Sequence, residues 1–213
     1  MSWPAGKVFE ETIEVAREDG VHLRARRFTP DWAEAEQGRG AGVVVIGDSA
    51  SATDAMLDGV VRPLASAGYF VVALPLLDEG ERAIEDLEAG VLSVKELAGG
   101  RIGVLGLGAA GAVALAAAAT LPQLDAVVVA GGPPPGAAVR LARLRASILL
   151  HRVAHGGAWT DDAVADLLAR VKRSKAPVVV RTHDAADGFF GGDSSEARIA
   201  MDQTRDFLAA SLT

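Results

Sequence analysis

The sequence predicts a doubly wound α/β domain, with a mostly parallel sheet of about eight strands and an antiparallel hairpin at its start. Two segments that alternate apolar and polar residues flank the turn Glu18-Asp19-Gly20. From residue 42 onward, short apolar runs alternate with helical periodicities, which is typical of parallel strands joined by crossover helices. The 213 residues, half of them hydrophobic, are enough for one well-buried domain over residues 1–213.

Eight segments have the pattern of β-strands. Residues 10–16 and 21–28 alternate around the turn, as expected of a hairpin with one buried face. The others are short continuous apolar runs, typical of strands buried on both faces. They cover residues 42–46, 69–74, 101–105, 125–130, 147–153 and 177–181.

Five segments have the pattern of helices. Apolar residues recur every three to four positions in residues 54–67 and 81–97, and residues 109–120 are rich in alanine. Thr160 is the expected N-cap of a helix that reaches residue 172, with carboxylates in its first turn, where the helix dipole favours them. Residues 195–212 form the closing helix, and residues 191–195 are expected to be its loop and N-cap.

Composition excludes several kinds of site and partner. The chain has no cysteine, so disulfides, thiolate metal sites and a cysteine nucleophile are excluded. The net charge of −7, without a cluster of basic residues, gives no reason to expect a nucleic acid partner. No signal pattern opens the chain, and its longest apolar stretch, residues 109–121, is too short to span a bilayer. We therefore expect a cytoplasmic protein with no membrane partner.

The most informative segment is Gly-Leu-Gly-Ala-Ala-Gly at residues 106–111, between a strand and a helix. Two kinds of site use this geometry: the phosphate-binding turn of dinucleotide folds, and the nucleophile elbow of hydrolases. The nucleotide-binding turn usually follows the first strand and needs an acidic residue at the end of the next one. Here the turn follows the third parallel strand, and the next strand ends in Gly131-Gly132. The elbow interpretation is therefore favoured, with Gly108 at the nucleophile position.

Several stretches together resemble the dienelactone hydrolase family of α/β-hydrolases. Residues 103–111 match that family's G-x-C-x-G-G elbow in place and spacing, and residues 65–73 resemble a phrase ending in A-G-Y-x-V-x-A. Residues 185–189 resemble the G-A-x-H-G-F segment that carries the family's histidine, and the terminal helix through residues 205–208 fits as well. The resemblance runs from about residue 12 to residue 212 and implies an α/β-hydrolase fold.

Carried over by position, the resemblance implies that every member of the catalytic triad is substituted. The nucleophile position is Gly108, the acid position is Gly156 and the base position is Asp187. Acyl transfer needs an attacking atom, a base to take its proton and a group that orients the base, and glycine supplies no attacking atom. Of the functional groups that the family has in the segment after the first parallel strand, this chain retains only a carboxylate, at Asp48. We therefore expect no catalytic residues and no working esterase or lactonase.

Three uses of such a chain remain open. In the first, it is a pseudoenzyme that binds a small organic molecule or guides a non-hydrolytic reaction. The residues expected to line that pocket are Asp48, Ser49, Gly108, Ala109, Gly156 and Asp187. In the second, it is an interaction or scaffold subunit with a filled pocket, and a homo-oligomer fits either use. In the third, it is a hydrolase with an unconventional serine, Ser49 or Ser51, although these residues also suit a helix cap near Asp54.

No cofactor and no metal is expected. A group of histidines and carboxylates near two neighbouring strand ends has the chemistry of a metal site: His151, His155, His183, Asp184 and Asp187. None of them has a convincing ligand spacing on a helix, and the alternative is separate loop residues, with His183 solvated. An Asp48–Asp187 pair for acid–base chemistry likewise competes with solvated loop carboxylates. Trp159 is expected to pack at a helix start rather than to serve as a ligand platform.

Overall fold

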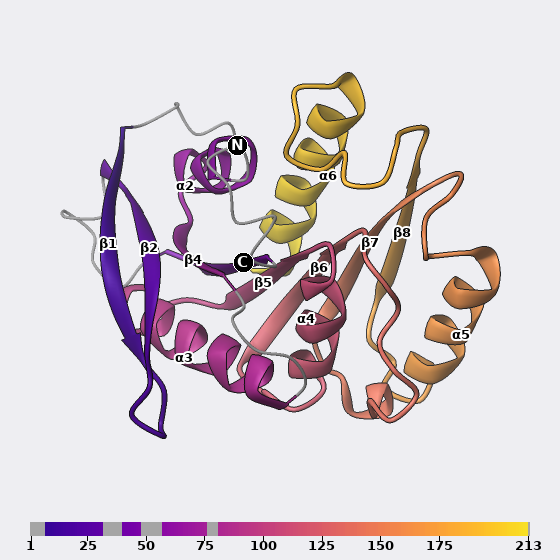
Figure 1. Cartoon of the computed structure of the whole chain (residues 1–213), viewed down its shortest axis with the longest axis horizontal. Helices are drawn as coiled ribbons and strands as arrows, with labels where there is room; N and C mark the ends of the chain where they lie inside the picture. Colours follow the sequence, from indigo (N-terminus) through magenta and orange to yellow (C-terminus); the bar gives the residue numbers. More distant parts are fainter. Residues whose placement is uncertain (1–6, 32–39, 48–56, 76–80, 213) are drawn as a thin grey trace.

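The computed structural model describes residues 7–31, 40–47, 57–75 and 81–212. Its sheet has eight strands in the order β1-β2-β4-β3-β5-β6-β7-β8, with helices on both faces (Figure 1). The pairs β1–β2 and β2–β4 are antiparallel, whereas all the other neighbouring strands are parallel. This arrangement confirms the predicted mostly parallel, doubly wound sheet with a leading hairpin.

The elements follow the predicted order. The strands are β1 Val8–Ala16, β2 His22–Pro30, β3 Gly42–Gly47, β4 Phe70–Pro75, β5 Ile102–Leu107, β6 Leu124–Ala130, β7 Ser147–Val153 and β8 Val178–His183. The helices are η2 Leu57–Val61, α2 Arg62–Ser66, α3 Glu81–Leu97, α4 Ala110–Ala118, η3 Leu141–Arg143, α5 Asp161–Val171 and α6 Ser195–Ser211. The helix expected at residues 54–67 is described only from residue 57, and there it begins as the π-helical turn η2 and continues as α2.

Each face of the sheet has its own apolar core. On one face Leu87 and Val91 of α3, Leu115 of α4 and Leu167 of α5 join one buried cluster. On the other face Leu64 of α2 and Met201 and Leu208 of α6 join a second cluster. The parallel strands contribute to both clusters, because successive side chains of a strand point to opposite faces. Helix α6 therefore covers the face opposite α4, as Figure 1 shows.

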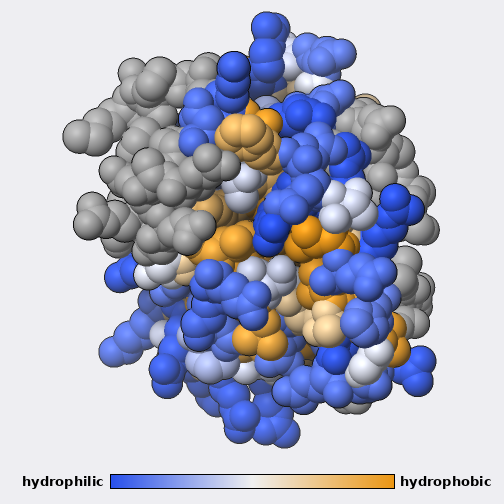
Figure 2. Space-filling view, turned by 90° about the vertical axis from the view of Figure 1, so that its left-hand side faces the viewer, coloured by the Kyte–Doolittle hydropathy of each residue, from blue (hydrophilic) through white to orange (hydrophobic). Residues whose placement is uncertain are grey.

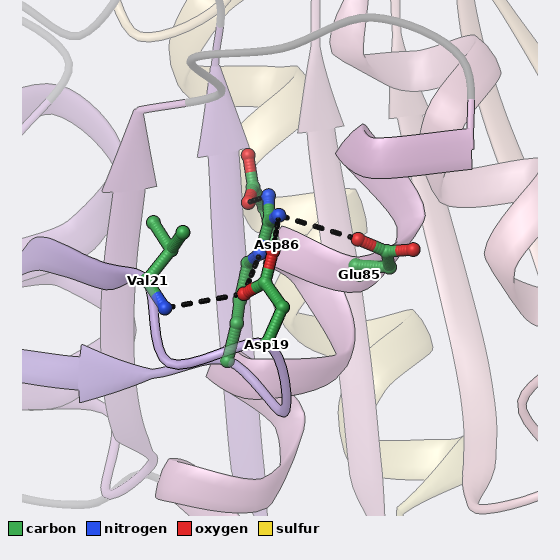
Figure 3. Close-up of polar contacts among 5 residues, drawn as sticks. Asp19, Val21, Glu85 and Asp86 are labelled. Carbon is green, nitrogen blue, oxygen red and sulfur yellow. Dashed lines mark hydrogen bonds and ion pairs between the residues drawn. The ribbon is translucent and has the colours of Figure 1, made fainter.

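A buried ion pair ties the hairpin to α3. The guanidinium of Arg17 donates to Asp86 over 2.9 Å and also binds Asp19, and Glu85 lies 3.4 Å away (Figure 3). The side chain of Asp86 is fully buried and that of Arg17 nearly so. The hydrogen bond with Asp19, followed by that with Asp86, raises the pKa of Arg17, and the same bond with Arg17 lowers the pKa of Asp19. A charge pair at the hairpin turn thus fixes the antiparallel unit against the parallel one.

The hairpin forms one edge of the sheet. Charged pairs cross it from β2 to β1, with Arg26 bonded to Glu10 and Arg27 bonded to Glu11. The hairpin side of the molecule is mostly hydrophilic, with apolar patches between the charged groups (Figure 2). Charged side chains on an edge strand oppose pairing with a further strand. Within the described ranges, no helix is both long enough and apolar enough to cross a bilayer.

The N-cap of α5 provides a test of the local sequence rules. The Thr160 side chain accepts a hydrogen bond from the backbone N–H of Ala163, as the sequence predicted. We expect Thr160→Ala to lower the free energy of unfolding by about 1 kcal/mol, because it leaves that N–H without its acceptor. Urea denaturation measures the change. Thr160→Ser keeps the acceptor and should stay close to wild type, so equal losses in the two variants would contradict the cap.

Candidate functional site

The glycine turn lies at the centre of the sheet, at the carboxyl end of β5. Gly108 has φ of +56° between the last residue of β5 and the first turn of α4. Its N–H donates to the carbonyl of Ala130 over 3.0 Å, and its own carbonyl accepts from Gly111 over 3.0 Å. This positive φ is the conformation that the middle residue of a strand–turn–helix elbow adopts. Since the turn follows β5 in mid-sheet and not a first strand, the dinucleotide alternative is disfavoured by topology.

Neighbouring glycines let the helix approach the sheet at this point. A Cβ at Gly106 would lie 2.6 Å from the carbonyl oxygen of Ala110, and one at Gly111 would lie 2.7 Å from a methyl of Val129. A Cβ at Gly132 would lie 1.9 Å from the carbonyl oxygen of Gly108. No side chain fits at such distances, so the end of β6 and the elbow meet as bare backbone.

Asp187 reaches this junction from the loop between β8 and α6. Its Oδ1 accepts from the N–H of Gly188 and lies 3.1 Å from where a Cβ on Gly131 would stand. A Cβ at Gly132 would also lie 3.0 Å from the backbone nitrogen of Ala109. The structure thus gathers Gly108, Ala109 and Asp187 around Gly131 and Gly132.

The other expected site residues are not part of this group. Gly156 follows β7 with φ of +76°, and a Cβ there would meet nothing within 4 Å. Asp48, Ser49 and Ser51 lie outside the described residues, so neither the Asp48–Asp187 pair nor the serine alternative is placed. Trp159 is buried, and its Nε1 donates to the carbonyl of Gly131 over 3.3 Å. It packs behind the junction, as expected, instead of forming a platform.

The expectation that His183 is solvated is wrong. The side chains of His151 and His183 are both buried, and His151 Nδ1 lies 2.9 Å from His183 Nε2. The reason is that β8 runs to residue 183, two residues beyond its predicted end, and α6 covers this face of the sheet. His155 and Asp184 are exposed, so the expected cluster divides. Among the described residues, no group of three or more side chains has an arrangement that could hold a metal.

The histidine pair continues into α6. His151 Nε2 lies 3.0 Å from Thr204 Oγ1, and His183 Nδ1 lies 3.2 Å from Glu196 Oε2. Burial, with smaller contributions from the charges of His183 and Arg181, lowers the pKa of His151 from 6.5 to about 3. The sequence carried a signal for this pair: counting in twos from the apolar residues Leu149 and Val179 puts both histidines on the sheet face that α6 covers.

Comparison with known proteins agrees with this geometry. The model of the dienelactone hydrolase family matches residues 76–210, which is more than half of the sequence. The chain belongs to the dienelactone hydrolase family. No curated protein matches the sequence.

Solved structures share the fold at low sequence identity. A putative dienelactone hydrolase from Klebsiella pneumoniae is 18% identical with a TM-score of 0.79, covering 96% of this chain and 98% of that one. The esterase Pf2001 of Pyrococcus furiosus is 16% identical with a TM-score of 0.81, covering 100% of this chain and 99% of that one. A dienelactone hydrolase-like promiscuous phosphotriesterase, P91, from metagenomic libraries is 18% identical with a TM-score of 0.76, covering 98% and 100%. These identities support a common fold and leave the chemistry to this chain's own residues.

Two glycines that follow neighbouring strands share a positive φ and so form a matched pair for testing the contact at the elbow. Gly132 and Gly156 both have positive φ, of +71° and +76°, but only Gly132 faces backbone at 1.9 Å. Gly156→Ala should cost about 1–2 kcal/mol for the backbone conformation alone. Gly132→Ala should cost about 1–3 kcal/mol more, because the elbow must move. Thermal melts of both variants measure the difference, and equal melting temperatures would contradict the contact.

The buried His151 gives stability a pH dependence of known sign. The pKa of His151 is 6.5 in the unfolded chain and about 3 in the fold, so between these values only the unfolded chain holds the proton. The stability that His151 contributes is present above pH 6.5 and is lost on acidification, by at most about 1.4 kcal/mol per pH unit. Urea denaturation between pH 7 and pH 5 should therefore show a smaller loss in His151→Gln than in wild type. The exposed His155→Gln should retain the wild-type slope, and a parallel slope in His151→Gln would count against the shift.

Proposed function

We propose that this member of the dienelactone hydrolase family is a pseudoenzyme, which binds a small organic molecule at the carboxyl edge of its sheet and does not hydrolyse it. The observation that carries the proposal is Gly108 at φ of +56° in the elbow. An elbow holds its central residue in this left-handed conformation so that a side chain can point at the substrate. Glycine retains the turn and supplies no attacking atom.

The surroundings of the elbow support the same proposal. Asp187, at the position that the resemblance assigns to the base, is a carboxylate on an exposed loop. His183 is close in the chain, but both of its ring nitrogens already have partners, His151 and Glu196. A general base needs a ring nitrogen that can reach the proton it removes, and both nitrogens of His183 are engaged with His151 and Glu196. The acid position, Gly156, has no side chain.

The same groups indicate what kind of ligand fits. The N–H groups of Ala109 and Ala110 precede the first turn bond of α4, which runs from Gly111 N–H to the carbonyl of Gly108, and they can donate to a ligand oxygen. Asp187 offers a carboxylate that accepts hydrogen bonds. We infer a small, uncharged organic ligand that carries both a carbonyl-type acceptor and a hydroxyl-type donor.

We expect no turnover of p-nitrophenyl acetate or of simple lactones above a heat-treated control, because the described residues provide no nucleophile–base pair at the elbow. A chromogenic assay with the purified chain measures this directly. Esterase activity that disappears in Ser49→Ala or Ser51→Ala would overturn the proposal and identify an unconventional serine.

Restoring a side chain at the elbow distinguishes a binding pocket from a filled one. If the space is open, Gly108→Ser should cost only about 1–3 kcal/mol, the strain of a non-glycine residue at positive φ. Adding Gly156→Asp and Asp187→His to it would rebuild the triad positions and should yield slow ester cleavage. Severe unfolding by Gly108→Ser alone would instead indicate a filled pocket and a scaffold subunit. Thermal melts beside Gly156→Ala provide the reference for strain alone.

A further inference from the structure

Four side chains form one continuous hydrogen-bonded chain beneath the loop between β8 and α6. It runs from Glu196 through His183 and His151 to Thr204, over 3.2, 2.9 and 3.0 Å. Thr204 Oγ1 also lies 2.9 Å from the carbonyl oxygen of Ala200. The outer end of the chain reaches solvent, since the side chain of Glu196 is 32% exposed, while the rest of it is buried.

The Glu196 end determines where one proton sits. An ionised carboxylate only accepts hydrogen bonds, and so does an imidazole nitrogen without its hydrogen. His183 Nδ1 faces Glu196 Oε2 at 3.2 Å and therefore carries a hydrogen. If His183 is neutral, its Nε2 carries no hydrogen and accepts a hydrogen bond from the N–H at His151 Nδ1.

In this neutral arrangement every bond runs in one direction. His151 Nδ1 donates to His183 Nε2, so His151 Nε2 is the acceptor and takes the hydroxyl hydrogen of Thr204. The hydroxyl of Thr204 has a single hydrogen, which here goes to His151. It therefore donates no hydrogen bond to the carbonyl of Ala200 in this arrangement.

A proton added to the chain reverses the two inner bonds without moving a heavy atom, while His183 Nδ1 still donates to Glu196. The hydrogen of His151 Nδ1 passes to His183 Nε2, and the added proton ends on His151 Nε2. His183 is then an imidazolium that donates to both His151 and Glu196. His151 stays neutral and donates from Nε2 to Thr204, whose hydroxyl turns to the carbonyl of Ala200 at 2.9 Å. All donors are satisfied in both arrangements, which is what a buried polar chain requires.

We propose that this chain is a pH-sensitive switch, in which one proton taken up from solvent converts the His183–Glu196 contact into an ion pair between β8 and α6. The charged and titratable groups that face the switch are His151 on β7, Glu196 on α6 and Arg181 on β8. The burial of His151, followed by the charges of His183 and Arg181, lowers the pKa of His151 and so keeps the cation on His183.

The switch acts on the loop that carries Asp187. The ring of Phe189 lies 4.9 Å from that of His183, and the ring of Phe190 lies 5.3 Å from that of His151. A cation at this distance from an aromatic face is attracted to it, so protonation should hold the loop more firmly. The consequence for a bound ligand rests on the proposed function, whereas the exchange of protons does not.

Nuclear magnetic resonance of the imidazole nitrogens in the full-length, ¹⁵N-labelled chain tests the switch between pH 8 and pH 5. We expect His183 to become doubly protonated, while His151 stays neutral and changes its tautomer from Nδ1–H to Nε2–H. The His151 signals are assigned by their loss in His151→Gln, and the exposed His22 and His155 serve as reference imidazoles outside the chain of hydrogen bonds. A His151 tautomer that is constant across the range, or a His183 that stays neutral at pH 5, would overturn the proposal. Neither result depends on whether the elbow binds a ligand or hydrolyses an ester.

Glu196→Gln separates the switch from a merely structural pair. A glutamine amide can either donate to His183 Nδ1 or accept from it, so the hydrogen is no longer held there. His151 should then populate the Nε2–H tautomer already at pH 8, and the change of tautomer on acidification should become smaller. Asp202→Asn removes one negative charge from an exposed position of the same helix and should behave as wild type. An unchanged tautomer exchange in Glu196→Gln, or the same loss in Asp202→Asn, would refute the role of Glu196.

Discussion

The close approach of α4 to the centre of the sheet is the constraint on which the site depends. Side chains are absent where backbone meets backbone: a Cβ at Gly106 would meet Ala110, and one at Gly132 would meet the carbonyl of Gly108 at 1.9 Å. The hydrogen bond from Gly108 N–H to Ala130 then ties the elbow to β6. Because β5 and β6 are central strands, any shift of this junction propagates into the cores on both faces.

This constraint separates the architecture of a hydrolase from its chemistry. The positive φ of Gly108 is a requirement of the turn, and the small residues around it are a requirement of packing. Neither needs a nucleophile, so both can persist when the attacking atom is absent. Glycine at position 108 even removes the strain that a serine or cysteine would carry there. A family match therefore supports the fold of this chain more strongly than it supports any reaction.

Features set by local patterns could be predicted from the sequence, whereas those set by distant contacts could not. The bounds of α3, the hairpin and the cap of α5 follow from apolar spacing and turn or cap chemistry within a few residues. The Arg17–Asp86 pair joins residues 69 positions apart, and no local pattern marks it. His183 was misplaced because a polar residue at a strand end is ordinarily solvated. The packing of α6 over β7 and β8, together with the ring of Phe189, buries it.

In the histidine pair, the hydrogen-bond partners that make burial possible also determine where the protons lie. A lone buried histidine would leave one ring nitrogen without a partner, at a free-energy cost comparable to a lost hydrogen bond. The second histidine supplies that partner, and Thr204 and Glu196 complete the chain at both ends. Thr204 can turn its hydroxyl to either His151 or Ala200, so the chain remains satisfied with or without the extra proton. The loop with Asp187 packs on these rings through Phe189, which connects the proton content of the interior to the rim of the elbow.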